Sequence, residues 1–195
     1  HMREDWTVDQ LIDFFDDEPL DFAPGTRWHY TNSGYILLGA ILEKVTGRTY
    51  AEVVADWIFR PLGMKDTRYD SEAPIIPGRV EGYRRTPDGV INAPYLSMTQ
   101  PFAAGALLST VDDLARWQSA LDRGEILSAE SRRRMWTPAV LADGRSTRYG
   151  FGWAVWNYAG HAVVEHGGSV NGFTTANMRL PDDRIYVAVL SNCGG

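Results

Sequence analysis

The chain has 195 residues, enough for one domain with a hydrophobic core. Apolar residues make up 44% of it and aromatic residues 12%, which fits a globular protein and excludes a disordered one. The formal net charge of −6 argues against a nucleic-acid surface. The single cysteine, Cys193, excludes an internal disulfide. The longest apolar run, 35–42, is too short to cross a bilayer, so we expect neither a nucleic-acid partner nor a membrane segment in this chain.

Capping patterns predict two helices near the start. Thr7 opens a capping box before a short helix that is expected to end near 16–18. Asn32 or Ser33 can cap a second helix, which Gly47 stops. Because the apolar residues of this second helix lie on all its sides, we expect it to be buried.

Three further helices are expected before residue 148, and a segment rich in proline and glycine, 74–101, is expected to be loop with short strands. The helices begin at Thr49, Thr110 and Ser128 and end before Pro61, near Gly124 and before Pro138. The last of them carries the only basic run, Arg132–Arg134. Such a run is typical of a solvated helix face, and the alternative is a patch for a partner.

The pattern changes to strands in the last part of the chain. Alternating or continuous apolar residues predict strands near 151–155, 162–164, 173–180 and 185–190. The fold class is therefore α+β. A mainly helical part, 1–148, is followed by antiparallel strands, 149–195, and both are expected to belong to one domain.

Tyr30 and Asn32 lie just before the second predicted helix. A rigid element at that point can direct side chains into a cleft. A tyrosine hydroxyl can relay protons if a nearby cation lowers its pKa from about 10, and an asparagine side chain can grip an amide through its donor and acceptor. The structural alternative is that Asn32 caps the helix and Tyr30 packs beside it.

The run His166-Gly167-Gly168-Ser169 lies on or beside a predicted strand. Two glycines in a strand indicate a bulge or the close approach of another backbone. The functional interpretation is a substrate that lies alongside the strand. The structural alternative is a tight turn with an exposed histidine.

In this order, Tyr30-Thr31-Asn32 and His166-Gly167-Gly168-Ser169 resemble the second and third active-site motifs of the penicillin-recognising serine hydrolases. This family includes class C β-lactamases, D-Ala-D-Ala carboxypeptidases and related esterases. The resemblance extends over most of the chain, through the stretches 22–25, 33–47, 61–67 and 102–114.

The resemblance implies part of a β-lactamase/transpeptidase-like fold and hydrolysis of an amide or ester through an acyl-enzyme. The substrate would be a β-lactam, a D-amino-acid peptide or a small ester, with no cofactor and no metal. Tyr30 would relay the proton, Asn32 would contact the substrate amide, and His166 would be a polar partner of Tyr30 or of a substrate carboxylate. The Ser169 N–H would donate to the oxyanion, with Gly168 allowing the close approach.

The family's first motif, Ser-x-x-Lys, is absent. The only lysines are Lys44 and Lys65, and Ile41 and Leu62 stand three residues before them. We expect the nucleophile upstream of residue 1, and we expect this chain alone to be inactive. The strands should then show an open edge and an exposed apolar face, to be covered by the missing segment or by a homodimer partner.

Other interpretations stay open. A homologue without the nucleophile could bind ligands or regulate without chemistry, and the chain could also be an engineered or proteolytic piece. Gly167 to Gly172 nearly matches a Gly-x-Ser-x-Gly elbow around Ser169, but the last glycine comes one residue late. Cys193 has no histidine near it in the sequence, and the histidines show no metal-ligand spacing.

Overall fold

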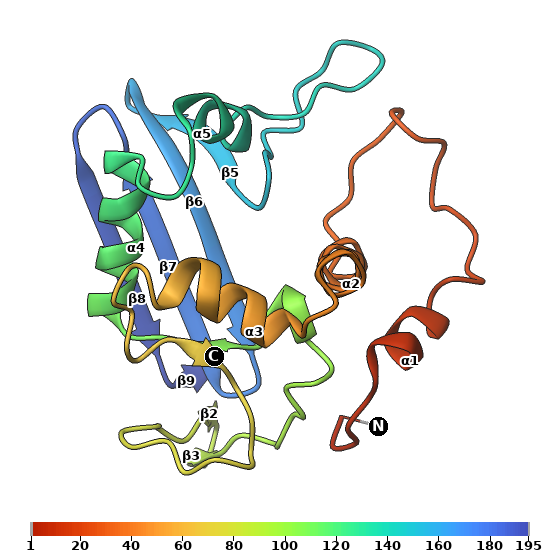
Figure 1. Cartoon of the computed structure of the whole chain (residues 1–195), viewed down its shortest axis with the longest axis vertical. Coiled ribbons are helices and arrows are strands. Elements are labelled where there is room, and N and C mark those ends of the chain that lie inside the picture. The colour runs from red at the N-terminus through yellow and green to blue at the C-terminus, as the bar shows by residue number, and fades with distance from the viewer. Residues whose placement is uncertain (1, 195) are drawn as a thin grey trace.

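Helices come first along the chain and long strands come last in the computed structural model, which describes residues 2–194 (Figure 1). This arrangement confirms the α+β prediction. The helices are α1 (Val8–Asp13), α2 (Ser33–Thr46), α3 (Tyr50–Val54), the π-helical turn η1 (Ala55–Phe59), the 3-10 turn η2 (Phe102–Ala104), α4 (Val111–Arg123) and α5 (Ala129–Met135).

The strands of the described residues form three small sheets. Short pairs join β1 (Arg68–Tyr69) to β4 (Leu107–Leu108), and β2 (Tyr83–Thr86) to β3 (Gly89–Asn92) and β9 (Cys193–Gly194). The main sheet is antiparallel, in the order β5 (Ala154–Tyr158), β6 (His161–Val170), β7 (Phe173–Leu180), β8 (Ile185–Ser191).

The predicted capping residues define the helices. Thr7 and Thr49 each form a capping box, and Thr110 and Ser128 accept N–H groups of the first turns of α4 and α5. Gly47 follows α2 in the left-handed conformation, with φ 66°. One boundary differs from the prediction, because α1 ends at Asp13 and the chain then continues in turns.

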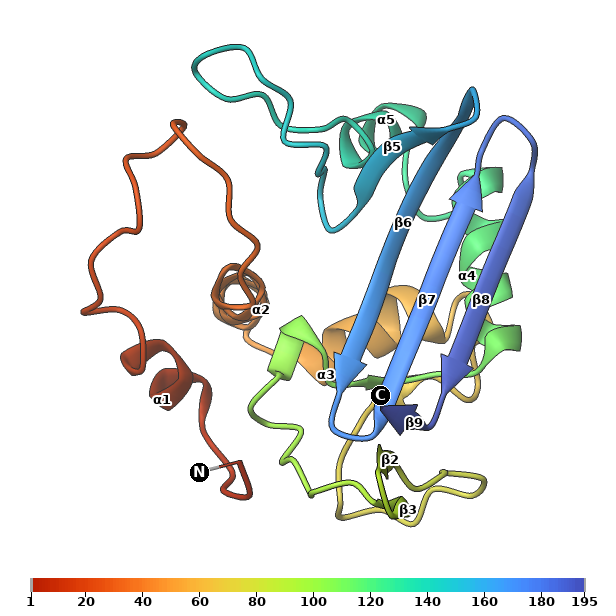
Figure 2. The same ribbon diagram turned by 180° about the vertical axis from the view of Figure 1, so that it is seen from behind.

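Within residues 2–194, helices cover one face of the main sheet and leave the other face bare (Figure 1 and Figure 2). Figure 2 shows the strands in front, with α4 and α5 behind them. In the described part of the chain, β8 is an edge strand, and Ile185, Val187 and Val189 are all exposed on it at every second position. The open edge and the exposed apolar side chains expected from the sequence are therefore present.

The start of β5 differs from the prediction. The alternation at 151–155 predicted a strand there, but the strand begins only at Ala154. Gly152 has a φ of 77°, and the Gly150 N–H donates to the Trp153 carbonyl over 2.8 Å, so the chain turns tightly before it enters the sheet.

The expected burial of α2 is wrong. Only Ile36 and Gly39 are buried, whereas Leu37, Leu38, Ile41 and Val45 are exposed, Val45 by 79%. The reason is the number of neighbours, since α2 contacts α1, α3 and η2 on one side and its other side faces solvent. Gly39 packs closely against η2. A Cβ added at this position would lie 2.5 Å from side-chain atoms of Phe102 and Ala103.

The buried apolar residues form separate small clusters. Leu11, Ile36 and Phe102 join α1 and α2 to η2, and Leu121, Trp153 and Val164 join α4 to the sheet. No helix within residues 2–194 is both long and apolar enough to cross a membrane.

A buried carboxylate connects α4 to the segment before β1. Asp113 is fully buried and accepts the Asp66 N–H, the Thr67 hydroxyl and an Arg116 guanidinium N–H, each over 2.8 Å. It also lies in the first turn of α4, where the helix dipole favours negative charge. This side chain therefore accepts from several donors at once in a fully buried site.

We predict that Asp113→Ala lowers the free energy of unfolding by about 3 kcal/mol, because it leaves buried donors without an acceptor. Asp112→Ala is the matched control, since Asp112 is exposed in the same first turn; it should cost about 0.5 kcal/mol. Urea denaturation followed by circular dichroism measures both, and equal losses would contradict the buried role of Asp113.

The raised pKa of Tyr69 predicts that the free energy of unfolding falls at alkaline pH. Burial raises the pKa of Tyr69 to about 12, and its hydroxyl donates to the Met98 carbonyl over 3.0 Å. The phenol keeps its proton in the folded chain at a pH where the unfolded chain, with a pKa of about 10, has lost it. The stability that Tyr69 contributes is thus complete below pH ~10 and is lost as the pH rises toward ~12. Denaturation at a series of pH values should show this loss, and Tyr69→Phe should weaken it whereas the exposed Tyr158→Phe should not.

Candidate active site

Tyr30 and His166 lie side by side although they are far apart in the sequence. Tyr30 belongs to the exposed segment before α2, and His166 lies on β6. Their ring centroids are 6.0 Å apart, with the ring planes tilted by 40°. The two sequence motifs therefore meet in one place in the fold.

A third ring, Tyr149, joins this pair, and sequence reasoning missed it. Its hydroxyl lies 2.8 Å from Nε2 of His166. Its ring centroid lies 6.0 Å from Tyr30 and 5.2 Å from Trp28, so the segment before α2 meets the sheet through aromatic contacts. The two glycines that follow it, Gly150 and Gly152, were the available signal, because they mark a turn in a stretch expected to be a strand.

The contacts of His166 define its neutral form. Its Nδ1 lies 2.6 Å from the Gly167 carbonyl oxygen, which can only accept, so Nδ1 carries the proton. In the neutral imidazole, Nε2 is then the acceptor, and the Tyr149 hydroxyl donates to it. Both ring nitrogens are thus engaged, and His166 meets Tyr30 through its ring.

The pKa values of Tyr149 and Tyr35 are both raised, so these two side chains stay protonated. Burial raises the pKa of Tyr149, and the nearby Tyr35 and Tyr30 raise it further. Burial and then Tyr30 raise the pKa of Tyr35 in the same direction. A negative charge on one of these phenols therefore disfavours a charge on the others, which remain hydrogen-bond donors.

Asn32 stands at the N-cap position of α2, but its side chain makes no capping hydrogen bond. The Thr31 hydroxyl takes over part of this function by accepting the Ser33 N–H over 3.2 Å. The exposed Asn32 amide is therefore available to a ligand, and capping alone does not account for it.

Gly168 and Ser169 lie on β6, where the strand has one neighbour. β5 pairs with β6 only from His161 to Glu165, whereas β7 pairs with it as far as Val170. Within the described sheet, residues 166–170 therefore present an unpaired backbone edge on the side away from β7.

The glycine at 168 also has a reason inside the sheet. An added Cβ would lie 2.7 Å from Oγ1 of Thr175, the residue opposite Gly168 on β7. Gly168 thus lets the Thr175 side chain lie across the strand. This contact exists without any substrate, so the oxyanion role of Ser169 and Gly168 stays a prediction.

The rival sites find no support in the geometry. Ser169 lies in a β-hairpin, with Gly172 at φ 81° in the two-residue turn to β7, whereas a nucleophile elbow needs a turn from strand to helix. Cys193 lies on β9, which pairs with β2. Among residues 2–194, no group of three or more histidine, cysteine or acidic residues is placed to hold a metal ion.

Comparisons with known proteins find relatives over the whole chain. The Beta-lactamase family model matches residues 2–195. Penicillin-binding protein 4* of Bacillus subtilis (strain 168) is 30% identical over 198 residues, which cover 93% of this chain and 44% of that protein. The D-aminopeptidase of Gluconobacter oxydans (strain 621H) is 29% identical over 173 residues, which cover 89% of this chain and 33% of that protein.

The fold is shared with a solved structure of a related enzyme. The D-stereospecific amidohydrolase from Streptomyces sp. superposes with a TM-score of 0.85 at 27% identity, covering 99% of this chain and 58% of the other. The chain therefore spans less than half the length of the two curated relatives and about three fifths of this structure.

We predict that the Tyr149 hydroxyl holds neutral His166 in the form protonated at Nδ1. Free neutral histidine prefers the other tautomer, so Tyr149→Phe should raise the share of His166 protonated at Nε2. Nitrogen-15 NMR of the imidazole measures this share directly. The control is Tyr158→Phe, an exposed tyrosine on β5. An unchanged tautomer in Tyr149→Phe would mean that the Gly167 carbonyl alone fixes the ring.

Proposed function

This chain belongs to the Beta-lactamase family of serine hydrolases, and we propose that it carries the proton-relay and substrate-binding part of an amidohydrolase site for D-amino-acid amides or peptides. The observation that carries the proposal is the meeting of Tyr30, His166 and Tyr149 beside the unpaired edge of β6. Two relatives, a D-aminopeptidase and a D-stereospecific amidohydrolase, support this substrate class.

The unpaired edge at 166–170 suits an extended peptide or amide. Backbone N–H and C=O groups on such an edge can pair with an added strand, as in β-augmentation. The exposed Gly167 and Gly168 carry no side chain that would keep the ligand away. The substrate backbone would thus lie along β6, with its scissile carbonyl near Ser169.

Tyr30 is the proposed proton relay. A serine hydroxyl supplied from outside residues 1–195 would attack the substrate carbonyl while Tyr30, acting as a phenolate, takes the serine proton. Tyr30 would then pass this proton to the amine as the carbonyl–nitrogen bond breaks, which leaves the acyl-enzyme. Tyr149 and Tyr35 keep their own protons, because burial and the nearby Tyr30 raise their pKa values. Of these three phenols, the proposal assigns the proton transfer to Tyr30 alone.

His166 and Ser169 have supporting roles in this proposal. His166, held by Tyr149 and the Gly167 carbonyl, forms a fixed wall beside the Tyr30 ring. The Ser169 N–H would donate to the carbonyl oxygen as it becomes negative, and one such donor is worth about 3 kcal/mol in the transition state. Asn32 would bind the substrate amide through its side chain, which makes no capping hydrogen bond to α2.

The alternative is a binding or regulatory module, and one observation favours it: no Ser-x-x-Lys can be read in these 195 residues. The same unpaired edge would then hold a peptide without cleaving it. The coding sequence upstream of His1 would distinguish the two functions. A Ser-x-x-Lys motif encoded there supports the enzyme, and a start codon at Met2 supports the binding module.

We predict that the isolated chain forms no covalent adduct with a fluorophosphonate probe or with a fluorescent penicillin, because no lysine-activated serine lies within it. Intact mass spectrometry measures this. A serine hydrolase of known activity, treated in parallel, controls for the reagents. An adduct mapped to Ser169 or to another serine of this chain would overturn the proposed division of the site.

We also predict that the isolated chain binds D-phenylalaninamide more tightly than its L-enantiomer. Amide NMR should show the largest shifts at residues 166–170 and Tyr149. His166→Ala should weaken this binding, and His161→Ala is the matched control because His161 lies on the same strand and pairs with Asp183 instead. Equal shifts for both enantiomers would contradict the substrate class, and shifts elsewhere would contradict the site.

A further inference from the structure

A hollow of about 250 Å³ is lined in part by Tyr149, the residue whose hydroxyl contacts His166. The end of α5 and the residues after it form one wall, and 149–151 forms the other. Two backbone hydrogen bonds of 2.9 and 3.0 Å join these walls, from the Phe151 N–H to the Met135 carbonyl and from the Ala139 N–H to the Tyr149 carbonyl. The hollow is therefore built on a fixed frame.

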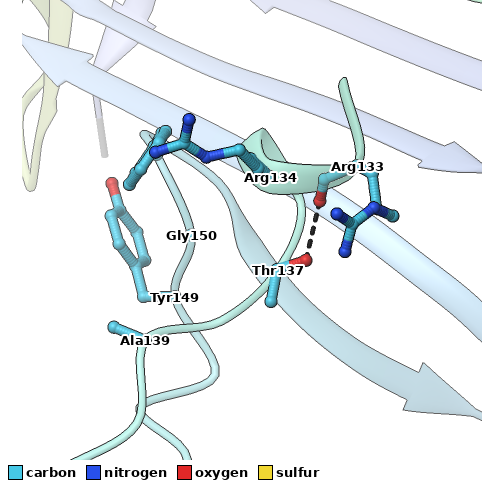
Figure 3. Close-up of a pocket in the computed structure, with 7 residues that line it drawn as sticks. Arg133, Arg134, Thr137, Ala139, Tyr149 and Gly150 are labelled. Atoms are coloured by element: carbon cyan, nitrogen blue, oxygen red, sulfur yellow. Dashed lines mark hydrogen bonds between the residues drawn. The ribbon is translucent and has the colours of Figure 1, made fainter. Parts of the chain in front are cut away.

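Arg133 and Arg134 line the hollow, and they differ in whether an acidic side chain pairs with them. Arg133 donates to the Glu130 carboxylate from Nη2 over 2.5 Å and from Nε over 3.1 Å. Arg134 has no ion pair or side-chain hydrogen bond with any residue that the structure describes. In Figure 3 the Arg134 side chain extends toward Tyr149, whereas the Arg133 side chain points away from Tyr149.

Aromatic surface completes the hollow. The Tyr149 ring lines it, and so does Phe151, which is 65% exposed. An uncompensated guanidinium beside exposed rings suits a ligand that joins a carboxylate to an apolar stem, because the planar fork of arginine matches a carboxylate and the rings cover the stem. The volume lies below that of sites for whole drug-sized ligands, so it fits one substituent.

We propose that this hollow is a subsite for a carboxylate on an apolar stem, with Arg134 as the anion-binding residue. It rests on the proposed function in one respect, namely that the carboxylate belongs to the substrate bound along β6. Tyr149 connects the two places, since its ring lines the hollow and its hydroxyl holds His166. A carboxylate bound in the hollow would therefore be separated from His166 by the Tyr149 side chain.

The probes are 3-phenylpropionate and 3-phenylpropanamide, which share a stem and differ in charge. In NMR titrations of the chain we expect the acid to bind about threefold more tightly than the amide, as an exposed ion pair allows, with shifts at the Arg134 Nε signal and the Phe151 N–H. The preference should shrink in 0.5 M NaCl because salt screens the pair.

Arg134→Gln should abolish this preference. Arg145→Gln is the control, because Arg145 is exposed, is paired with Asp143 and does not line the hollow. Thermal unfolding of each variant verifies its fold. Equal binding of acid and amide, or a preference that survives Arg134→Gln, would overturn the subsite. The D-phenylalaninamide titration tests the proposed function separately, because that ligand carries no carboxylate.

Discussion

The hydrogen bond between the Tyr149 hydroxyl and His166 is the constraint on which the candidate site depends. It fixes the imidazole on β6, and Tyr149 in turn presents the ring against which Trp28 and Tyr30 lie. The segment 23–32, which carries Tyr30, is exposed along its whole length and meets the sheet at this place through ring contacts. Among the described residues, His166 is the other ring that lies against Tyr30.

Local chemistry made the helices predictable. A threonine at an N-cap and a glycine at a C-cap act over a few residues, so Thr49 and Gly47 could be read directly. The meeting of Tyr30 with His166 was anticipated differently, through the resemblance of two motifs to a family. No periodicity in this chain would have placed those two rings together.

Contacts across the fold were not predictable in the same way. The apolar sequence of α2 shows which residues could be buried, but not that neighbours cover only one side. Arg132–Arg134 were expected to form a solvated helix face, with a patch for a partner as the alternative. Arg133 and Arg134 are exposed, but the three side chains differ in their contacts. Arg132 donates to the Leu121 and Asp122 carbonyls at the end of α4, Arg133 pairs with Glu130, and Arg134 has no ion pair among the described residues. Neighbouring positions on a helix face different surroundings, and only the tertiary structure distinguishes them.

One local turn produces both features that the proposed chemistry needs. β5 begins at Ala154, opposite Glu165, so a longer β5 would have paired with His166 and covered the edge beyond it. The tight turn at Gly150–Trp153 leads the chain out of the ladder at that point. The residue before the turn, Tyr149, then reaches His166 with its side chain in place of a backbone pair. The same turn therefore leaves open the strand edge at which the substrate is proposed to lie, and it supplies the hydroxyl that orients the histidine beside it.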